Sequence, residues 1–186
     1  MAMSYATIGE DPNAEAAVEK LVTRFYENQH IAGVVYEMAK SYRLSRKDER
    51  ANHICNLIIG KWPKSEHALW AQRDLARFSI SIGDELNAQA AADKLLADFS
   101  KQGRIAQAVY DIAKQYHDLQ KYEEAGLFYQ YVINNWPDDE YAMRAEADLV
   151  KIHINLGDEV AAQNALDTLI ADFNEHPDFS DTVLLV

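Results

Sequence analysis

The feature that most constrains this chain is an internal repeat. Shifting the sequence by 74 positions aligns residues 31–99 with residues 105–173 without a gap, and 30 of these 69 positions are identical. Inside this period lies a shorter one of 37 residues, at which a large aromatic residue and an alanine recur. The aromatic positions are Phe25, Trp62, Phe99, Trp136 and Phe173, and the alanine positions are Ala14, Ala51, Ala88, Ala125 and Ala162. A unit of this size cannot bury its apolar face alone, so it is expected to stack on copies of itself.

Each unit is predicted to contain two helices. In the third full unit the apolar residues Val109, Ile112, Ala113 and Tyr116 follow the spacing of one helix face. In the fourth, a helix from about Asp139 to Leu156 is expected to stop at Gly157, and Asp158 is expected to cap the next helix. The alternation of apolar and polar residues typical of a strand does not interrupt the series. The pattern therefore predicts an all-α solenoid.

The turns between units carry a second signal. Pro63 and Pro137 follow the two tryptophans at the point where a second helix must stop, because proline cannot continue the hydrogen-bond ladder of a helix. Ser65 and Asp139 then turn the chain into the next first helix.

At these residues the sequence resembles the tetratricopeptide repeat (TPR) family. The matching positions are the small residues Ala39 and Ala113 of the first helix, Ala51 and Ala125 of the second, the aromatic Tyr129, and the closing Pro63 and Pro137. The unit is three residues longer than is usual for the family, and the second and fourth units depart from its pattern at Ser79, Ser100, Val150, His153 and Asn174. The resemblance implies a right-handed superhelical α-solenoid of stacked antiparallel helix pairs.

The repeat also predicts the domain organisation. We expect a single solenoid over residues 1–186, with a partial unit at 8–31, full units at 32–68, 69–105, 106–142 and 143–179, and the start of a further helix at 180–186. The long unit and its W-P-x-x-E-x-A junction are similar to the repeats of bacterial extracytoplasmic members of the family, such as outer-membrane assembly lipoproteins and the Tol-Pal coordinating protein. That similarity suggests a periplasmic location.

Composition excludes several classes of function. The formal net charge of −12 repels phosphate backbones and anionic lipid, which argues against nucleic acid as a partner. No apolar run is long enough to insert in a membrane. The single cysteine, Cys55, occupies an apolar column of the repeat and is expected to be a buried, inert thiol.

No pattern of catalytic or cofactor-binding residues stands out. The histidines lack metal-ligand spacing, and neither a phosphate-binding glycine loop nor a nucleophile turn is present. The sequence thus predicts a protein that is not an enzyme and that uses no cofactor or metal.

The TPR resemblance implies that first helices line a concave groove that binds a protein or peptide. One column of these helices is wholly basic, at Lys40, Arg77, Lys114 and Lys151, and further polar and aromatic residues share its face, at Tyr36, Arg43, Trp70, Arg73, Gln107, Tyr110, His117 and Arg144. These twelve residues are the predicted protein-binding groove, and their charge suggests a partner with acidic residues.

A structural interpretation of the basic column competes with this one. An acid stands three residues before each basic position, at Glu37, Asp74, Asp111 and Asp148. Each first helix could therefore carry an i, i+3 ion pair that adds roughly 0.2 to 0.5 kcal/mol of helix stability.

The ends of the chain leave two further alternatives open. Residues 13–25 correspond to a second helix without its first helix, and the chain closes on the apolar TVLLV. The chain is expected to be a segment of a longer solenoid, or else to have terminal helices that act as caps or support self-association. Accordingly, the favoured function is a non-catalytic interaction scaffold. The alternative is a structural or docking segment of a larger envelope-assembly protein whose groove holds no ligand.

Overall fold

The computed structural model describes residues 11–25, 27–28 and 30–183 of the chain. Within these residues every regular element is a helix. The helices are α2 (Asp11–Phe25), α3 (His30–Leu44), α4 (Asp48–Lys61), α5 (Glu66–Ser81), α6 (Glu85–Phe99), α7 (Ile105–Asp118), α8 (Tyr122–Asn135), α9 (Glu140–Leu156), α10 (Glu159–Phe173) and α11 (Phe179–Val183). None of these helices is both long and apolar enough to cross a bilayer.

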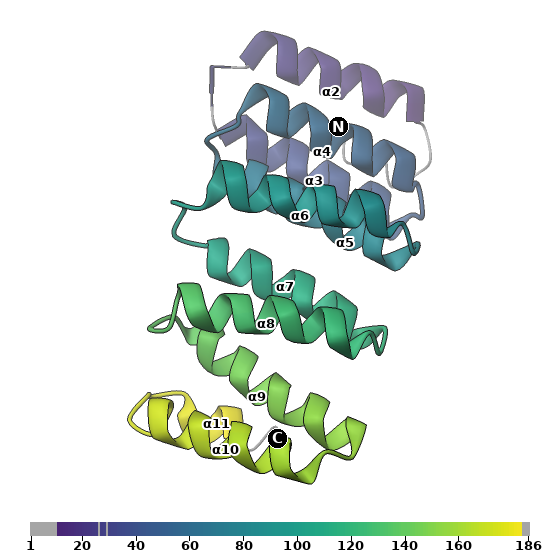
Figure 1. The fold of residues 1–186 in the computed structure, drawn as a ribbon. Coiled ribbons are helices and arrows are strands. Elements are labelled where there is room, and N and C mark those ends of the chain that lie inside the picture. Colours follow the sequence, from purple (N-terminus) through teal and green to yellow (C-terminus); the bar gives the residue numbers. More distant parts are fainter. Residues whose placement is uncertain (1–10, 26, 29, 184–186) are drawn as a thin grey trace. The chain divides into compact units, whose positions relative to one another are not determined.

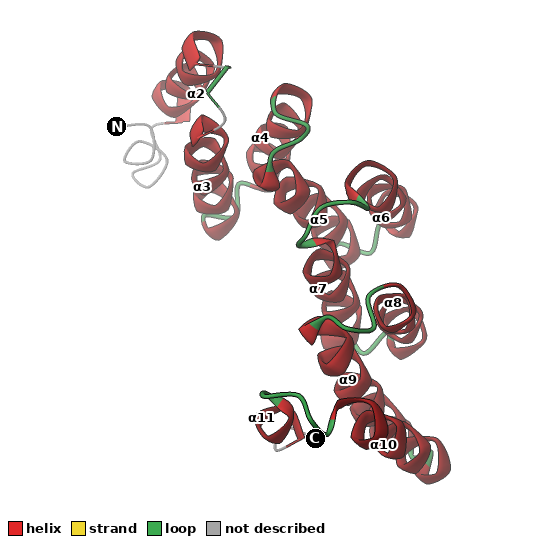
Figure 2. Ribbon diagram, turned by 90° about the vertical axis from the view of Figure 1, so that its left-hand side faces the viewer, coloured by secondary structure: helices red, strands yellow, loops and turns green. Residues whose placement is uncertain are grey.

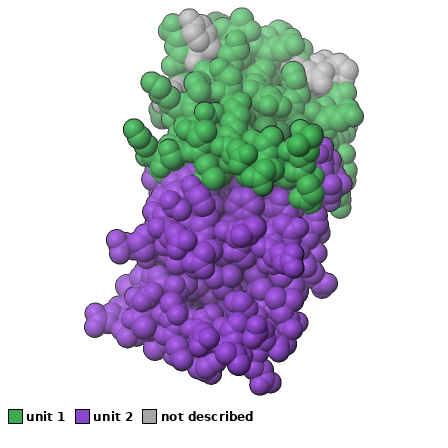
Figure 3. Space-filling model, viewed as in Figure 1, with its two compact units in different colours: residues 1–79, 85–102 green, residues 80–84, 103–186 purple. Residues whose placement is uncertain are grey.

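The chain divides into two compact units, which Figure 3 distinguishes by colour. Unit 1 comprises residues 1–79 and 85–102, and unit 2 comprises residues 80–84 and 103–186. The expectation of one continuous solenoid over residues 1–186 concerns how the units join, and it stays a prediction.

In unit 1, helices α3 and α4 form an antiparallel hairpin. Helix α3 packs on α4 and also on α2 (Figure 1). The apolar faces of α3 and α4 meet through Val35, Met38, Ile54 and Ile58, which are all buried. These residues follow the helical period read from the sequence, so burial of the amphipathic face accounts for the hairpin.

In unit 2, the helices form two rows. Helix α9 packs on α8, α10, α7 and α11, and α7 packs on α8. Figure 2 shows α7, α9 and α11 along one side of the unit and α8 and α10 along the other. The first helices of successive repeats therefore lie next to one another and share one face.

Small residues allow the close approach of these helices. The alanines of the 37-residue column at positions 51, 88, 125 and 162 are all buried. In unit 2 a cluster of Ala142, Met143, Ala147, Leu169 and Phe173 fills the space between α9 and α10. The recurring aromatic is buried at Trp62, Phe99 and Phe173 but 42% exposed at Phe25.

The helix ends agree with the sequence prediction. Gly157 ends α9 with a left-handed φ of 72°. The Asp158 side chain accepts a hydrogen bond from the Ala161 amide at 3.0 Å, which caps α10. Asp139 caps α9 in the same way through the amide of Tyr141, and the Ser65 hydroxyl accepts from the Ala68 amide.

The all-α repeat fold predicted from the sequence is confirmed, since stacked antiparallel helix pairs account for the described residues of both units. Of the apolar C-terminal stretch, Thr182 lies in α11 and is largely buried, while residues 184–186 lie outside the described part of the chain. The proposed self-association through this end therefore stays a prediction.

Candidate functional site

The twelve predicted groove residues all lie on first helices. In unit 1, Tyr36, Lys40 and Arg43 belong to α3, and Trp70, Arg73 and Arg77 belong to α5. In unit 2, Gln107, Tyr110, Lys114 and His117 belong to α7, and Arg144 and Lys151 belong to α9. In unit 2, Tyr110, Arg144 and Lys151 line one cavity and Gln107 lines another.

In unit 2, a buried carboxylate organises the face shared by α7 and α9. Asp148 is only 4% exposed. Its Oδ2 accepts hydrogen bonds from the hydroxyl groups of Tyr110, at 2.7 Å, and Tyr129, at 3.1 Å. Its Oδ1 accepts one from Lys151 Nζ at 3.0 Å. Three helices, α7, α8 and α9, are thus joined at one charged group.

These bonds set the charge of the cluster. Burial would raise the pKa of Asp148, but the hydrogen bonds from Tyr110, Lys151 and Tyr129 outweigh it and the pKa is lowered. Burial raises the pKa of both tyrosines, and the nearby Asp148 carboxylate adds to this effect. Asp148 is therefore an anion and both phenols are neutral donors.

His117 extends this cluster toward α8. Its Nδ1 lies 3.3 Å from the Tyr129 hydroxyl. Because that hydroxyl gives its one proton to Asp148, it can only accept from the histidine, so Nδ1 carries a proton. Burial lowers the pKa of His117, which favours the neutral ring with its proton on Nδ1.

Unit 1 repeats the same arrangement 74 residues earlier. The Tyr36 hydroxyl donates to Oδ2 of Asp74 at 2.7 Å. Arg73 takes the place of the lysine, since its guanidinium binds Oδ1 of Asp74 at 2.8 and 3.0 Å and also donates to the Tyr36 hydroxyl at 3.1 Å. Cys55 occupies the position of Tyr129, so unit 1 lacks the second phenol. A tyrosine–aspartate bond between successive first helices is therefore a repeated element of the fold.

The ion pairs of the first helices include the expected i, i+3 spacing. Such a pair joins Lys40 to Glu37 and Lys151 to Asp148. In α7, however, Lys114 pairs with Asp118 at 2.7 Å, one turn in the opposite direction. The sequence comparison did not consider this acid, although i, i+4 is also within reach on a helix surface.

Two further arginines of the predicted groove, Arg43 and Arg144, also have partners within the molecule. Arg43 donates to Asp48 and Asn52, at 3.3 and 2.7 Å, and lies over the ring of Phe78. Arg144 donates to Glu140 at 3.1 Å. These arginines are engaged within the molecule, so they are not free charges that await a ligand.

Tyr36 also differs from the expectation of a groove-lining residue, because it is only 5% exposed. Trp70 remains partly exposed, with the Arg73 guanidinium 4.7 Å from its ring centroid. Gln107 lines a cavity of about 360 Å³ at the N-terminal end of α7, together with Arg104, Tyr141 and neighbouring residues.

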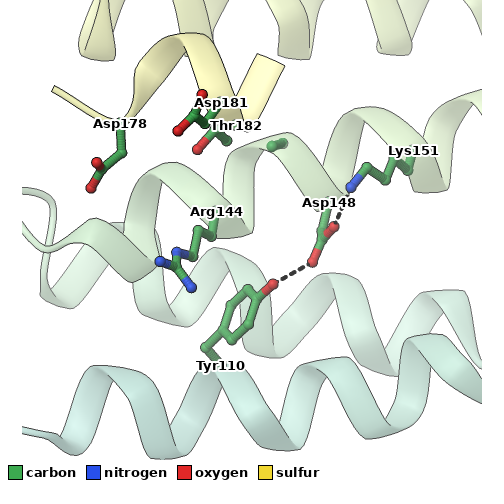
Figure 4. Close-up of a pocket in the computed structure, with 8 residues that line it drawn as sticks. Tyr110, Arg144, Asp148, Lys151, Asp178, Asp181 and Thr182 are labelled. Atoms are coloured by element: carbon green, nitrogen blue, oxygen red, sulfur yellow. Dashed lines mark hydrogen bonds and ion pairs between the residues drawn. The ribbon is translucent and has the colours of Figure 1, made fainter. Parts of the chain in front are cut away.

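The second cavity of unit 2 lies between the α7–α9 face and α11. Its volume is about 370 Å³, and its lining includes both acids and bases, namely Tyr110, Arg144, Ala147, Asp148, Lys151, Asp178, Asp181 and Thr182 (Figure 4). Asp178, Asp181 and Thr182 were not predicted from the sequence. They occupy the positions that a further first helix would have in the repeat. Only this position in the repeat suggested that they would face the same cavity as residues of α7 and α9.

Two other kinds of group that can carry chemistry are a cysteine thiol and a cluster of metal-ligating side chains. Cys55 is buried, and burial raises the pKa of its thiol to about 12, as expected for an inert thiol. Among the described residues, no group of three or more histidine, cysteine or acidic side chains is placed to hold a metal ion.

The helix pairs, the 37-residue period and the shared first-helix face define a TPR-like helical repeat protein. Solved structures with this fold include a kinesin light chain of Podospora anserina with nearly identical TPR-like repeats. That protein is 16% identical, with a TM-score of 0.55 over 92% of this chain and 90% of its own. MamA of Desulfovibrio magneticus RS-1 is 12% identical, with a TM-score of 0.54 over 95% of each chain. No family model matches the sequence, and no curated protein matches it either. At these identities the likeness shows the fold alone.

Proposed function

We propose that the protein is a non-catalytic interaction scaffold that binds a segment of a partner protein on its first-helix face. The observation that carries this proposal is the cavity of about 370 Å³ in unit 2, which α7, α9 and α11 line with polar side chains. The bonds from Tyr110 and Lys151 to Asp148 hold the wall of this cavity in place without a ligand. A prearranged surface of this kind loses less conformational entropy on binding.

The basic column gives less reason to expect an acidic partner than the sequence suggested. The sequence suggested an acidic partner because a basic column lines the first helices. In the structure, Lys40, Lys114, Arg144 and Lys151 each pair with an acid of their own helix. These pairs leave little uncompensated positive charge on the face, so they favour the structural interpretation of the column.

Site-specific photo-crosslinking tests the face that binds. A photoreactive amino acid at Gln107 or at Lys114, seven residues apart on α7, is expected to cross-link one partner of defined mass from the native source. The matched control is Leu127 on α8, which is 74% exposed and belongs to the other row of helices. The same adducts from all three positions would contradict the proposal.

The alternative is a docking segment of a larger assembly whose first-helix face holds no ligand. It predicts adducts from Leu127 or other second-helix positions, and none from Gln107 and Lys114. The same three variants therefore decide between the two functions.

A further inference from the structure

The cavity beside α11 has an uneven distribution of charge. Both of its cations are already matched, because Arg144 binds Glu140 at 3.1 Å and Lys151 binds Asp148 at 3.0 Å. Arg144 also lies over the ring of Tyr141, with 5.0 Å between its guanidinium carbon and the ring centroid. The positive charge of the lining is thus neutralised within α9 itself.

The two acids on the opposite wall, Asp178 and Asp181, are in a different situation. Neither carboxylate forms a hydrogen bond or ion pair with another group in the part of the chain that the structure describes. Both side chains are exposed. Figure 4 shows them on the α11 side of the cavity, with the guanidinium of Arg144 toward the α7 side. The uncompensated charge of the cavity is therefore negative.

A purely structural role at the start of α11 does not explain these acids. Where aspartates cap helices in this molecule, the carboxylate accepts a backbone N–H, as Asp139 does from Tyr141 and Asp158 from Ala161. No such bond reaches the side chain of Asp178 or Asp181 within the described residues.

The repeat itself does not explain them either. At the 37-residue period, the column of Asp178 contains no acid in the preceding units, and neither does the column of Asp181. The columns read His30, His67, Arg104, Tyr141, Asp178 and Gly33, Trp70, Gln107, Arg144, Asp181. Two neighbouring columns thus become acidic together only beside this cavity.

Size and chemistry then limit the ligand. A volume of about 370 Å³ is at the low end of the range of roughly 300–1,000 Å³ for ligand pockets, so the cavity suits one long side chain. Two carboxylates suit a guanidinium or an ammonium, while Ala147 and the Tyr110 ring can pack against an aliphatic stem. An acidic segment would meet Asp178 and Asp181 as like charges.

We infer that this cavity binds the cationic side chain of an Arg or Lys residue in the partner segment. The inference rests on the proposed scaffold function and gives it a chemical class, namely a basic segment. The net charge of −12 assists the approach of such a segment over a distance of about a Debye length.

The test needs no natural partner. N-acetyl-arginine amide is titrated into the full chain labelled with ¹⁵N, and amide chemical shifts are followed at Ala147, Thr182 and distant residues. We expect saturable shifts confined to the cavity. N-acetyl-citrulline amide, which has nearly the same shape but no charge, and N-acetyl-glutamate amide are expected to bind at least tenfold more weakly.

Matched variants assign the effect to the two acids. The double substitution Asp178→Asn and Asp181→Asn is expected to weaken arginine binding roughly tenfold. Asp138→Asn with Glu175→Gln removes the same charge from exposed positions outside the cavity lining and is expected to leave binding unchanged. Equal binding of citrulline, or undiminished binding by the first variant with its helicity intact, would overturn the inference.

The two proposals can fail separately. If Gln107 and Lys114 cross-link a partner but arginine does not bind, the scaffold stands and the basic ligand is wrong. If arginine binds the cavity but cross-links arise only from Leu127, the first-helix scaffold is wrong, and so is the inference that this side chain belongs to the partner segment.

Discussion

Glu146 shows how one residue can change the chemistry of an otherwise repeated position. In unit 1 the equivalent residue is Gln72, which is buried and donates from Nε2 to the carbonyl of Ala91 at 2.9 Å. Glu146 is 5% exposed, and its Oε2 has no hydrogen-bond partner among the described residues. Burial, and to a lesser degree the negative charge of Asp172, raise the pKa of Glu146 from 4.5 to about 7. Only the protonated acid can donate as Gln72 does.

This comparison predicts a pH-dependent stability. Because the folded pKa of Glu146 lies above its unfolded value, its ionisation destabilises the fold progressively as pH rises from about 4.5 to about 7. Glu146→Gln is therefore expected to raise the free energy of unfolding at pH 8 by on the order of 2 kcal/mol and to change it little at pH 4.5. Urea unfolding at several pH values measures the difference between variant and parent. An equal effect at both pH values would contradict the mechanism.

Individual side-chain environments were less predictable from the sequence than the helices that carry them. The burial of Cys55 was predicted from its apolar column and is confirmed. The depth of Tyr36 was not predicted, because helical periodicity assigns a residue to a face but does not give its distance from solvent. The bond from Tyr36 to Asp74 spans 38 positions, and no local pattern reveals it.

At the scale of the helix, one turn recurs in all four hairpins with different residues. One column of the 37-residue period lies just past the first helices, two residues after α3, α5 and α7 and one residue after α9. Its members Arg46, Gly83, Gln120 and Gly157 have left-handed φ values of 58°, 75°, 60° and 72°. At Gln120 and Gly157, the amide of the next residue bonds to the carbonyl five positions earlier, an arrangement typical of a Schellman motif. The geometry is therefore common to glycine and non-glycine sequences.

These turns predict opposite outcomes for two substitutions. Gln120→Gly is expected to stabilise unit 2 by about 0.5 to 1 kcal/mol, because a left-handed conformation strains a residue that has a Cβ. Gly157→Gln is expected to destabilise it by about 1 kcal/mol for the same reason. As a control, Gly126→Ala inside α8 meets only ordinary contact at 3.8 Å and is expected to gain roughly 0.5 to 1 kcal/mol. Thermal unfolding of the three variants measures the effect, and a loss of stability in Gln120→Gly would refute it.

Helix positions were predictable from sequence where a residue type forces them. Gly157 and Asp158 marked the break between α9 and α10 correctly. The left-handed turn at Gln120 carried no such mark, since neither glycine nor a capping aspartate stands there. At Gln120 the left-handed turn is set by the stacking of neighbouring helices and not by the type of residue.

For the whole molecule, the repeat implies that stability is a sum of local terms. A repeat chain gains most of its stability from contacts between neighbouring repeats, so damage is expected to spread over a short distance. The fully buried residues Leu95 in unit 1 and Leu169 in unit 2 are equivalent at the 74-residue period and allow a matched test.

We expect Leu169→Ala to cost about 2 to 5 kcal/mol locally. Hydrogen exchange followed by mass spectrometry should then show lost protection in α9 and α10 and little change in α3 and α4. Leu95→Ala should show lost protection in α6, with α9 and α10 little changed. Uniform loss of protection across the chain in both variants would mean that the two units unfold as one.

At this scale the sequence predicted the architecture and left the assembly open. The five aromatic and five alanine positions at a fixed period predicted a stacked repeat, and the helical spacing of apolar residues within each unit predicted that it consists of helix pairs. The sequence did not single out Asp178 and Asp181, because they depart from the repeat and periodicity identifies only residues that recur.

The burial of Cys55 gives the molecule an internal reporter. It is the single cysteine of the chain, and thiol reagents attack the thiolate, which burial suppresses in the closed hairpin of α3 and α4. The rate of modification by such a reagent therefore measures how often this hairpin opens. The native thiol therefore reports the local opening of one known hairpin, and no cysteine has to be introduced.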